Sequence, residues 1–415
     1  MVIKDITVTR GKDHVTLSAT CKLRKIGWDD IYITLEGSKH HEYIYEDASP
    51  FAAALLLPSM KQGEDLIIKG SISDQLYAGM YDIMKVVLDW NIGLKPIKII
   101  ADAVAQDTQR KNIHTASTFS GGVDSFYTYL KHKKDTKKSD RIDTFILVKG
   151  FDVDLRNTEL WDLTFKNVQA IAKKEGIELL TVETNARVVM EPIMPRGDYS
   201  HGGCLAGVGL ALRNGIQKLY IPATFSVEQQ VPWGSHMDVD PHWGTERLTF
   251  VHDGTEATRL DKIVLEVSKS PVALEHLRVC YMNEKGQYNC GDCDKCVRTM
   301  IHFYIAGALE KVDTFPHEID LRRVAAGPRD VHGDGKYIPL GEKHNLEGLQ
   351  ERNMDPELQE ALKESMVVIA NMRTGFTGKM KLQAAKLVQE AVYIDFAYTS
   401  SRLYKPMSKV FGRKF

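Results

Sequence analysis

The chain has 415 residues, with 54 basic and 55 acidic side chains and a formal net charge of −1 at pH 7. This balance gives no reason to expect a nucleic-acid partner or an anionic membrane surface. The longest apolar run, 51–57, is too short to cross a bilayer, and the first residues lack the apolar run of a signal peptide. We therefore expect a cytoplasmic protein of about two or three domains, with no membrane partner.

Residues 1–110 are predicted to form a separate, β-rich accessory domain. Alternating polar and apolar residues flank a turn at 11–13, and one amphipathic helix is expected over 73–88. Strands are expected at 6–9, 14–20, 31–35, 66–68 and 95–100. This segment shows no catalytic cluster, so we interpret it as a structural module or as a docking module for a protein partner.

Residues 111–312 are predicted to form an α/β domain, because strand and helix patterns alternate there. The expected strands are 115–119, 144–148, 178–182 and 218–223, and the expected helices are 158–174 and 202–213. This order favours a parallel sheet with helices on both faces. Ligands of such sheets bind beyond the carboxyl ends of the strands.

The first of these strands runs into the hexapeptide Ser120-Gly121-Gly122-Val123-Asp124-Ser125, and a helix-like segment follows. A strand, a glycine turn and a helix start form an anion cradle, because the helix N-terminus offers free N–H groups and partial positive charge. The glycines permit close approach of a phosphate, and the hydroxyls add donors. Asp124 would repel a bare phosphate, which indicates Mg²⁺ between them. An ordinary surface turn is the alternative.

The hexapeptide resembles the SGGxDS signature of the PP-loop, or N-type, ATP pyrophosphatases. It is not a Walker A loop, since GxxxxGK[ST] is absent from the chain. The resemblance implies an adenine nucleotide alpha-hydrolase-like fold and ATP cleavage between the α- and β-phosphates, with AMP passed to a substrate. It implies that ATP is bound by Ser120, Gly121, Gly122, Asp124 and Ser125, with Asp124 and Ser125 also catalytic.

A polar loop at 225–241 follows the strand at 218–223, in the position of the substrate loop of that family. Its candidate substrate-binding residues are Glu228, Ser235, His236 and Asp238, and Asp240 is a further group for substrate or a second Mg²⁺. An ordered surface loop with solvated carboxylates is the alternative.

Arg259 and Lys262, three residues apart, share one helical face and are candidate catalytic residues. Two cations there could grip the polyphosphate and stabilise the leaving pyrophosphate. An exposed basic helix is the alternative. Cys204, in a small-residue helix, is either a persulfide-forming nucleophile or a buried structural thiol.

Four of the six cysteines, Cys280, Cys290, Cys293 and Cys296, have spacers of nine, two and two residues. Four thiolates can close a tetrahedral shell around Zn²⁺, and Gly291 permits the tight turn between them. Such a closed site would be structural rather than catalytic. An iron–sulfur cluster and four unliganded cysteines are the alternatives. A helix is expected from about residue 294 to 309.

The glycine turn followed by these cysteines resembles the 7-cyano-7-deazaguanine synthase family, over roughly residues 113–312. The resemblance implies adenylation of a carboxylate on a 7-deazaguanine-type substrate, followed by displacement of AMP by ammonia. Three features depart from the family: the first cysteine spacer is one residue longer, the chain is extended at both ends, and 195–204, which includes Arg196, matches the substrate-recognition segment only loosely.

Residues 313–415 are predicted to be helical, with helices at 356–373 and 379–398 and a basic, aromatic tail at 404–415. The function predicted for the whole chain is an ATP-dependent ligase that joins an adenylated small-molecule carboxylate to a nitrogen nucleophile. The chain has no recognisable glutaminase motif to supply ammonia. A PP-loop sulfur transferase and a non-catalytic nucleotide-binding protein are the alternative classes.

Overall fold

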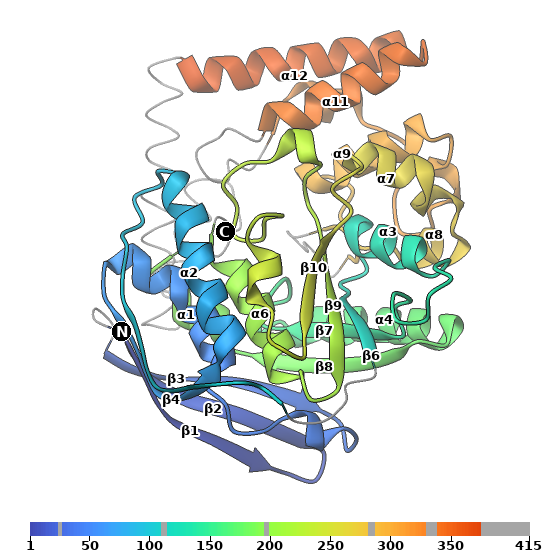
Figure 1. The fold of residues 1–415 in the computed structure, drawn as a ribbon. Coiled ribbons are helices and arrows are strands. Elements are labelled where there is room, and N and C mark those ends of the chain that lie inside the picture. Colours follow the sequence, from blue (N-terminus) through green and yellow to red (C-terminus); the bar gives the residue numbers. More distant parts are fainter. Residues whose placement is uncertain (24–26, 109–113, 195–198, 281–286, 329–337, 375–415) are drawn as a thin grey trace. The chain divides into compact units, whose positions relative to one another are not determined.

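The computed structural model describes residues 1–23, 27–108, 114–194, 199–280, 287–328 and 338–374 (Figure 1). The chain divides into two compact units. The first comprises Met1–Ser120 and Asp124–Thr258, and the second comprises Gly121–Val123 and Arg259–Phe415. Each unit is described by itself below.

One ten-stranded sheet organises the first unit, in the order β10-β9-β6-β7-β8-β3-β2-β1-β4-β5. Six of its nine neighbouring strand pairs are parallel, so the expected α/β class with a mostly parallel sheet is confirmed. The strands are β1 (Val2–Arg10), β2 (His14–Leu23), β3 (Gly27–Glu36), β4 (Leu66–Ser73), β5 (Ile99–Ala105), β6 (His114–Thr118), β7 (Thr144–Lys149), β8 (Glu178–Thr184), β9 (Ile216–Pro222) and β10 (Thr249–Asp253). The helices of this unit are α1 (Ser49–Gln62), α2 (Asp74–Asp89), α3 (Val123–His132), α4 (Thr158–Glu175), α5 (Ala186–Met190) and α6 (His201–Ala211), with short 3₁₀ turns η1 (His41–Tyr43), η3 (Val227–Gln229) and η4 (Asp240–Trp243).

The N-terminal strands belong to the same sheet as the α/β segment. β1 and β2 form the expected antiparallel hairpin, in which the Gly11 N–H donates to His14 O at 2.9 Å. β3 then pairs antiparallel with β8, where Ile33 lies opposite Thr184. The boundary predicted at 110 therefore does not coincide with a break between the compact units.

The parallel half of the sheet, β10-β9-β6-β7-β8, has a strand order that reverses beside β6. From β6 the chain adds β7 and β8 on one side, and it then returns to place β9 and β10 on the other side. In sheets of this kind the crevice outside the carboxyl ends of the two diverging strands is the usual ligand site. The loops that follow β6 and β9 flank this position.

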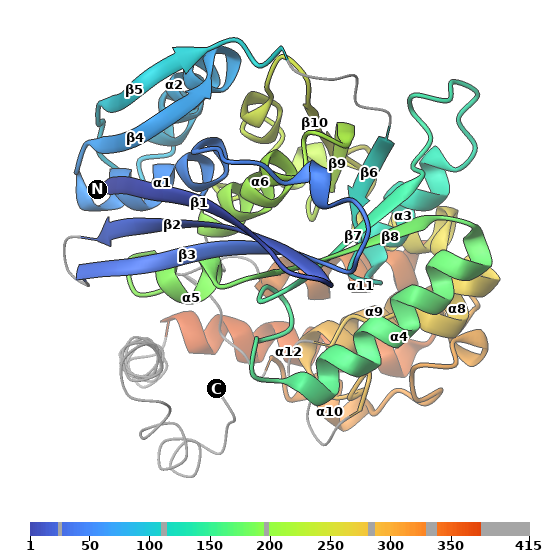
Figure 2. The same cartoon turned by 90° about the horizontal axis from the view of Figure 1, so that it is seen from below.

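Helices α1 and α6 are packed together inside the curve of the sheet, while α4 lies on its outer side (Figure 2). Twelve consecutive residues of α1, Ser49–Met60, are buried, and they include the apolar run 51–57. A Cβ at Gly203 would lie 2.6 Å from the Ala53 carbonyl oxygen, and one at Gly207 would lie 2.7 Å from that of Pro50. Only glycine at these two positions permits so close a contact between the helix backbones.

A buried charge network joins the end of α6 to the N-terminal segment. The Arg213 side chain pairs with Asp47 and donates through Nε to Asp107 at 2.6 Å. Arg247 Nη1 donates to the other oxygen of Asp107 at 3.0 Å, and the Arg213 guanidinium lies over the Tyr45 ring. Removing one member of such a network leaves a buried charge uncompensated, so the network fixes how these segments pack.

The second unit is helical in the part of the chain that the structure describes. Its elements are α7 (Arg259–Leu265), η5 (Val267–Lys269), α8 (Pro271–His276), α9 (Asp294–Ile305), η7 (Leu309–Lys311), α10 (Leu321–Ala325), α11 (Ile338–Glu351) and α12 (Pro356–Thr374). Helices before and after residue 312 share one apolar core, which includes Leu260, Ile301, Ile305, Val324, Leu349, Leu358 and Leu362. The boundary predicted at 312 therefore also lies inside a compact unit.

We predict that Gly207→Ala destabilises the protein, because the added methyl group meets a backbone oxygen that cannot move aside. Overpacking of this kind costs about 1–3 kcal/mol, which exceeds the gain of about 1 kcal/mol from the better helix propensity of alanine. Gly348→Ala in α11 is the matched control, because the nearest atom to its added methyl group is the terminal Cδ2 of the Leu260 side chain and not a backbone atom. The urea concentration at the unfolding midpoint should be lower than in wild type for Gly207→Ala and unchanged for Gly348→Ala. Equal midpoints for the two variants would contradict the close helix contact.

Candidate functional site

The glycine turn follows the carboxyl end of β6, which is the middle strand of the parallel half of the sheet. Phe119 N donates to Ile146 O on β7 at 2.9 Å, and the Phe119 ring stacks on Phe145 at a centroid distance of 4.0 Å. Gly121 has φ 76°, a left-handed conformation that strongly favours glycine. Ser125 is buried in the first turn of α3, whereas Ser120, Gly122 and Asp124 are half-buried. The sequence-predicted strand, turn and helix start are therefore all present in that order.

Helix α3 is fixed at its other end by the carboxylate of Asp253, the last residue of β10. Thr128 Oγ1 donates to Asp253 at 2.8 Å, Lys131 Nζ at 2.8 Å and His132 Nε2 at 2.9 Å. Burial raises the pKa of Asp253, but the contacts with His132 and Lys131 lower it more, so the carboxylate stays charged. These three bonds hold the direction of α3 and therefore of its N-terminus.

The loop after β9 brings some of its predicted residues together and leaves others in solvent. Ser235 Oγ donates to Asp240 Oδ2 at 2.6 Å. His236 is buried against the Trp90 ring and accepts from Asp238 N at 3.1 Å through Nδ1. Glu228, in η3, and the Asp238 side chain are exposed. The loop itself is held against α6, because a Cβ at Gly202 would lie 1.8 Å from Gly234 O.

His252 on β10 joins this loop, and sequence reasoning assigned it no role. Its Nδ1 lies 2.7 Å from Asp240 Oδ2 and 3.5 Å from Ser235 Oγ. The sequence contains only a weak indication of a role for His252. This residue begins a His-Asp-Gly run at the end of β10, a strand that was not predicted from the sequence. Ser235, Asp240 and His252 thus form a hydrogen-bonded cluster near the carboxyl end of β10.

Arg259 and Lys262 lie at the start of α7 in the second unit. Arg259 is half-buried and Lys262 is fully buried, which does not fit the alternative of an exposed basic helix. Their predicted role in binding polyphosphate stays a prediction. Cys204 is buried in α6 beside Met190, with the two sulfur atoms 3.8 Å apart, as expected for a structural thiol.

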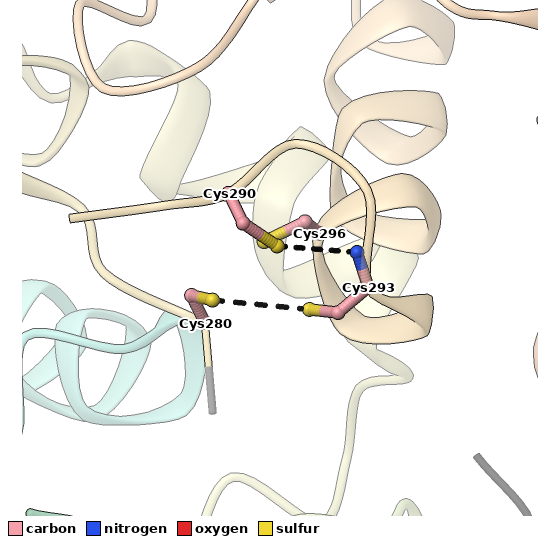
Figure 3. A group of neighbouring side chains, drawn as sticks. All are labelled: Cys280, Cys290, Cys293 and Cys296. Carbon is pink, nitrogen blue, oxygen red and sulfur yellow. Dashed lines mark hydrogen bonds between the residues drawn. The ribbon is translucent and has the colours of Figure 1, made fainter. Parts of the chain in front are cut away.

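The sulfur atoms of Cys280, Cys290, Cys293 and Cys296 all lie within 4.8 Å of one another (Figure 3). The Cys280–Cys293 pair is 4.0 Å apart and the Cys290–Cys296 pair is 3.9 Å apart. A tetrahedral zinc with Zn–S bonds of about 2.3 Å places its ligands about 3.8 Å apart. The geometry therefore fits a metal ion such as zinc.

The electrostatics of the cluster also favour a cation. Hydrogen-bonding contacts with the other three thiols, together with burial, raise the pKa of Cys296, because they favour its protonated form over the thiolate. A divalent metal removes this penalty. Cys290 Sγ in addition accepts backbone N–H groups from Cys293 at 3.2 Å and Asp292 at 3.5 Å, and Gly291 has φ 70°. Backbone N–H groups directed at a cysteine sulfur and a left-handed glycine between two cysteines are typical of a turn that holds metal-binding thiolates.

Two residues that sequence reasoning missed hold the cluster in place. Asn289 Oδ1 accepts from Val279 N at 2.9 Å and Cys280 N at 3.1 Å, and its Nδ2 donates to Leu277 O at 2.8 Å. Asn289 therefore connects the segment 277–280, which ends at Cys280, to the turn that begins at Cys290. Arg323 Nη2 donates to Asp294 at 2.6 Å and its Nε donates to Asp292 O at 2.8 Å, which clamps the turn from α10.

Three sequence-predicted features lie wholly or partly outside the described residues: residues 195–198 of the segment 195–204, which include Arg196, the helix at 379–398 and the tail at 404–415. Among the described residues, no helix is both long and apolar enough to span a membrane. No family model, curated protein or solved structure matches this chain.

Asn289→Ala is predicted to weaken metal binding, because Cys280 loses the side chain that fixes its backbone. Loss of a residue that orients a ligand typically lowers metal affinity about 10- to 100-fold. The measurement is the rate at which a coloured chelator removes zinc from the loaded protein. Asn167→Ala on α4 is the control and should release zinc at the wild-type rate; equal rates for both variants would rule out the proposed tie.

His132 is predicted to make the stability of the first unit depend on pH. Burial lowers the pKa of His132, but hydrogen bonds to Asp253 and Asp135 raise it more, so its folded pKa lies above the unfolded one. The resulting stabilisation is complete below the unfolded pKa and is lost as pH rises through the folded pKa. In the wild-type protein, the urea unfolding midpoint should fall as pH rises from the unfolded pKa of His132 through its folded pKa. In His132→Gln the midpoint should change less over the same pH range. His14→Gln, on the exposed side of β2, should behave as wild type.

Proposed function

We propose that the protein is an ATP-dependent C–N ligase of the PP-loop type. It would adenylate a small-molecule carboxylate, release pyrophosphate and pass the acyl group to a nitrogen nucleophile. One observation carries this proposal: the turn Ser120–Ser125, with Gly121 in a left-handed conformation, leaves the carboxyl end of β6 beside the point where the strand order reverses. A glycine turn that enters a helix there is well placed for a phosphate chain.

The residues of the turn would act mainly by position and charge. Backbone N–H groups of Gly121 and Gly122 and the hydroxyls of Ser120 and Ser125 would bind the phosphates. Asp124 would hold Mg²⁺, which supplies positive charge for the leaving pyrophosphate when it is bound. Because α3 is fixed by Asp253, these groups would be preorganised before ATP arrives.

The remaining parts of the proposal are assigned by chemistry. The cysteine cluster would hold Zn²⁺ in a closed structural site, since all four ligands are protein thiolates. Ser235 and His236 would contact the carboxylate substrate, for which a 7-deazaguanine-type acid is our first choice on the sequence resemblance. The burial of Cys204 gives no support to the sulfur-transferase alternative, because a persulfide carrier must be reached by its substrate.

The test uses the zinc-loaded protein with ATP, Mg²⁺ and 7-carboxy-7-deazaguanine. We expect AMP and pyrophosphate in equal amounts, and a loss of about 100-fold or more in Asp124→Asn, because the metal would lose its carboxylate ligand. Asp154→Asn, a control at a half-buried carboxylate paired with Arg156, should keep the wild-type rate. ADP and phosphate as products would contradict the proposal. Nucleotide binding without any pyrophosphate would favour the non-catalytic alternative.

A further inference from the structure

The Asp240–His252 pair has the arrangement of a proton acceptor and its supporting carboxylate. Asp240 is 1% exposed and the His252 side chain is 3% exposed, so their 2.7 Å contact is shielded from water. A carboxylate can only accept, so the proton of this bond is on Nδ1 of His252 and Nε2 is the free basic nitrogen. A buried carboxylate in this position also stabilises the imidazolium that forms when Nε2 takes a proton.

Few neighbouring groups compete with His252 for the Asp240 carboxylate. Oδ2 accepts from Ser235 Oγ as well as from His252, and Oδ1 has no hydrogen-bond partner among the described residues. Two further titratable groups lie nearby, His236 and the exposed Asp238. Burial lowers the pKa of His236 more than the Asp238 and Asp240 carboxylates raise it, so this second imidazole favours its neutral form.

The basic nitrogen of His252 is not sealed inside the protein. No described residue forms a hydrogen bond with Nε2, and Nε2 is not one of the fully enclosed polar atoms that lack a partner. It therefore reaches solvent, while Nδ1 on the opposite side of the ring is held by Asp240. His252 lies near the carboxyl end of β10, on the side of the sheet where the loops after β6 and β9 also emerge.

We propose that His252 is the general base of the second half-reaction and that Asp240 is its positioning residue. This inference rests on the proposed ligase function. The nitrogen lone pair of a neutral amine attacks the carbonyl carbon of the acyl-adenylate and forms the C–N bond. The bond from that carbon to the phosphate oxygen breaks, and AMP leaves with the electron pair. The proton lost by the amine goes to Nε2 of His252.

The experiment separates the two half-reactions in the zinc-loaded full chain. Adenylation is measured as isotope exchange between pyrophosphate and ATP with 7-carboxy-7-deazaguanine. Acyl transfer is measured by mass spectrometry of the amide formed with ammonium chloride. The variants are His252→Gln, whose amide N–H can still donate to Asp240, and Asp240→Asn. His242→Gln, a half-exposed histidine on the same loop, is the control.

We expect exchange close to the wild-type rate in His252→Gln and amide formation slower by about 100-fold or more, the usual effect of removing a general base. The ratio of wild-type to variant amide rates should fall as pH decreases, because protonated His252 no longer accepts a proton. Asp240→Asn should also slow amide formation, as His252→Gln does. His242→Gln should change neither step.

Three outcomes would overturn the inference. In the first, His252→Gln forms amide at the wild-type rate. In the second, exchange and amide formation fall equally in His252→Gln, which indicates a structural role. In the third, the rate ratio does not change with pH. Absence of exchange in the wild-type protein is a different result, since it contradicts the ligase proposal at its first step and removes the second step with it.

Discussion

The structure depends on the close approach of backbone to backbone around α6. Its glycines face four different segments: Gly203 and Gly207 meet α1, Gly202 meets the loop at Gly234, and Gly209 meets the side chains of Leu219 on β9 and Phe250 on β10. One helix therefore sets the position of an N-terminal element, of the loop after β9 and of the last two strands. Because protein interiors are close-packed, small changes on this helix are transmitted to all four segments.

The local parts of the fold could be predicted from sequence, whereas its long-range pairings could not. Alternation identified the β1–β2 hairpin, and the change to strand and helix patterns identified β6 to β9. Helix α1 was missed because it is buried on nearly all sides, so its apolar run 51–57 has no helical period. The pairing of β3 with β8 joins residues about 150 positions apart, for which spacing gives no signal.

In the candidate sites, too, the local motifs could be predicted from sequence and the long-range contacts could not. The glycine turn and the cysteine cluster are short motifs, and their geometry was expected from spacing alone. Asn289, Arg323 and His252 escaped sequence reasoning because their roles depend on groups brought close by folding. His252 in particular is one of 14 histidines, and only its contact with buried Asp240 distinguishes it from the others. Supporting residues of this kind are visible only in three dimensions.

The antiparallel pairing of β3 with β8 has a consequence for shortened forms of the protein. If the first 105 residues were removed, β8 would become an outer strand with unpaired N–H and C=O groups, and the apolar surface of α6 would lose α1. Unprotected strands of this kind recruit other chains and aggregate. The α/β half of this sheet is therefore not a free-standing module, because the segment that precedes it covers the edge of β8.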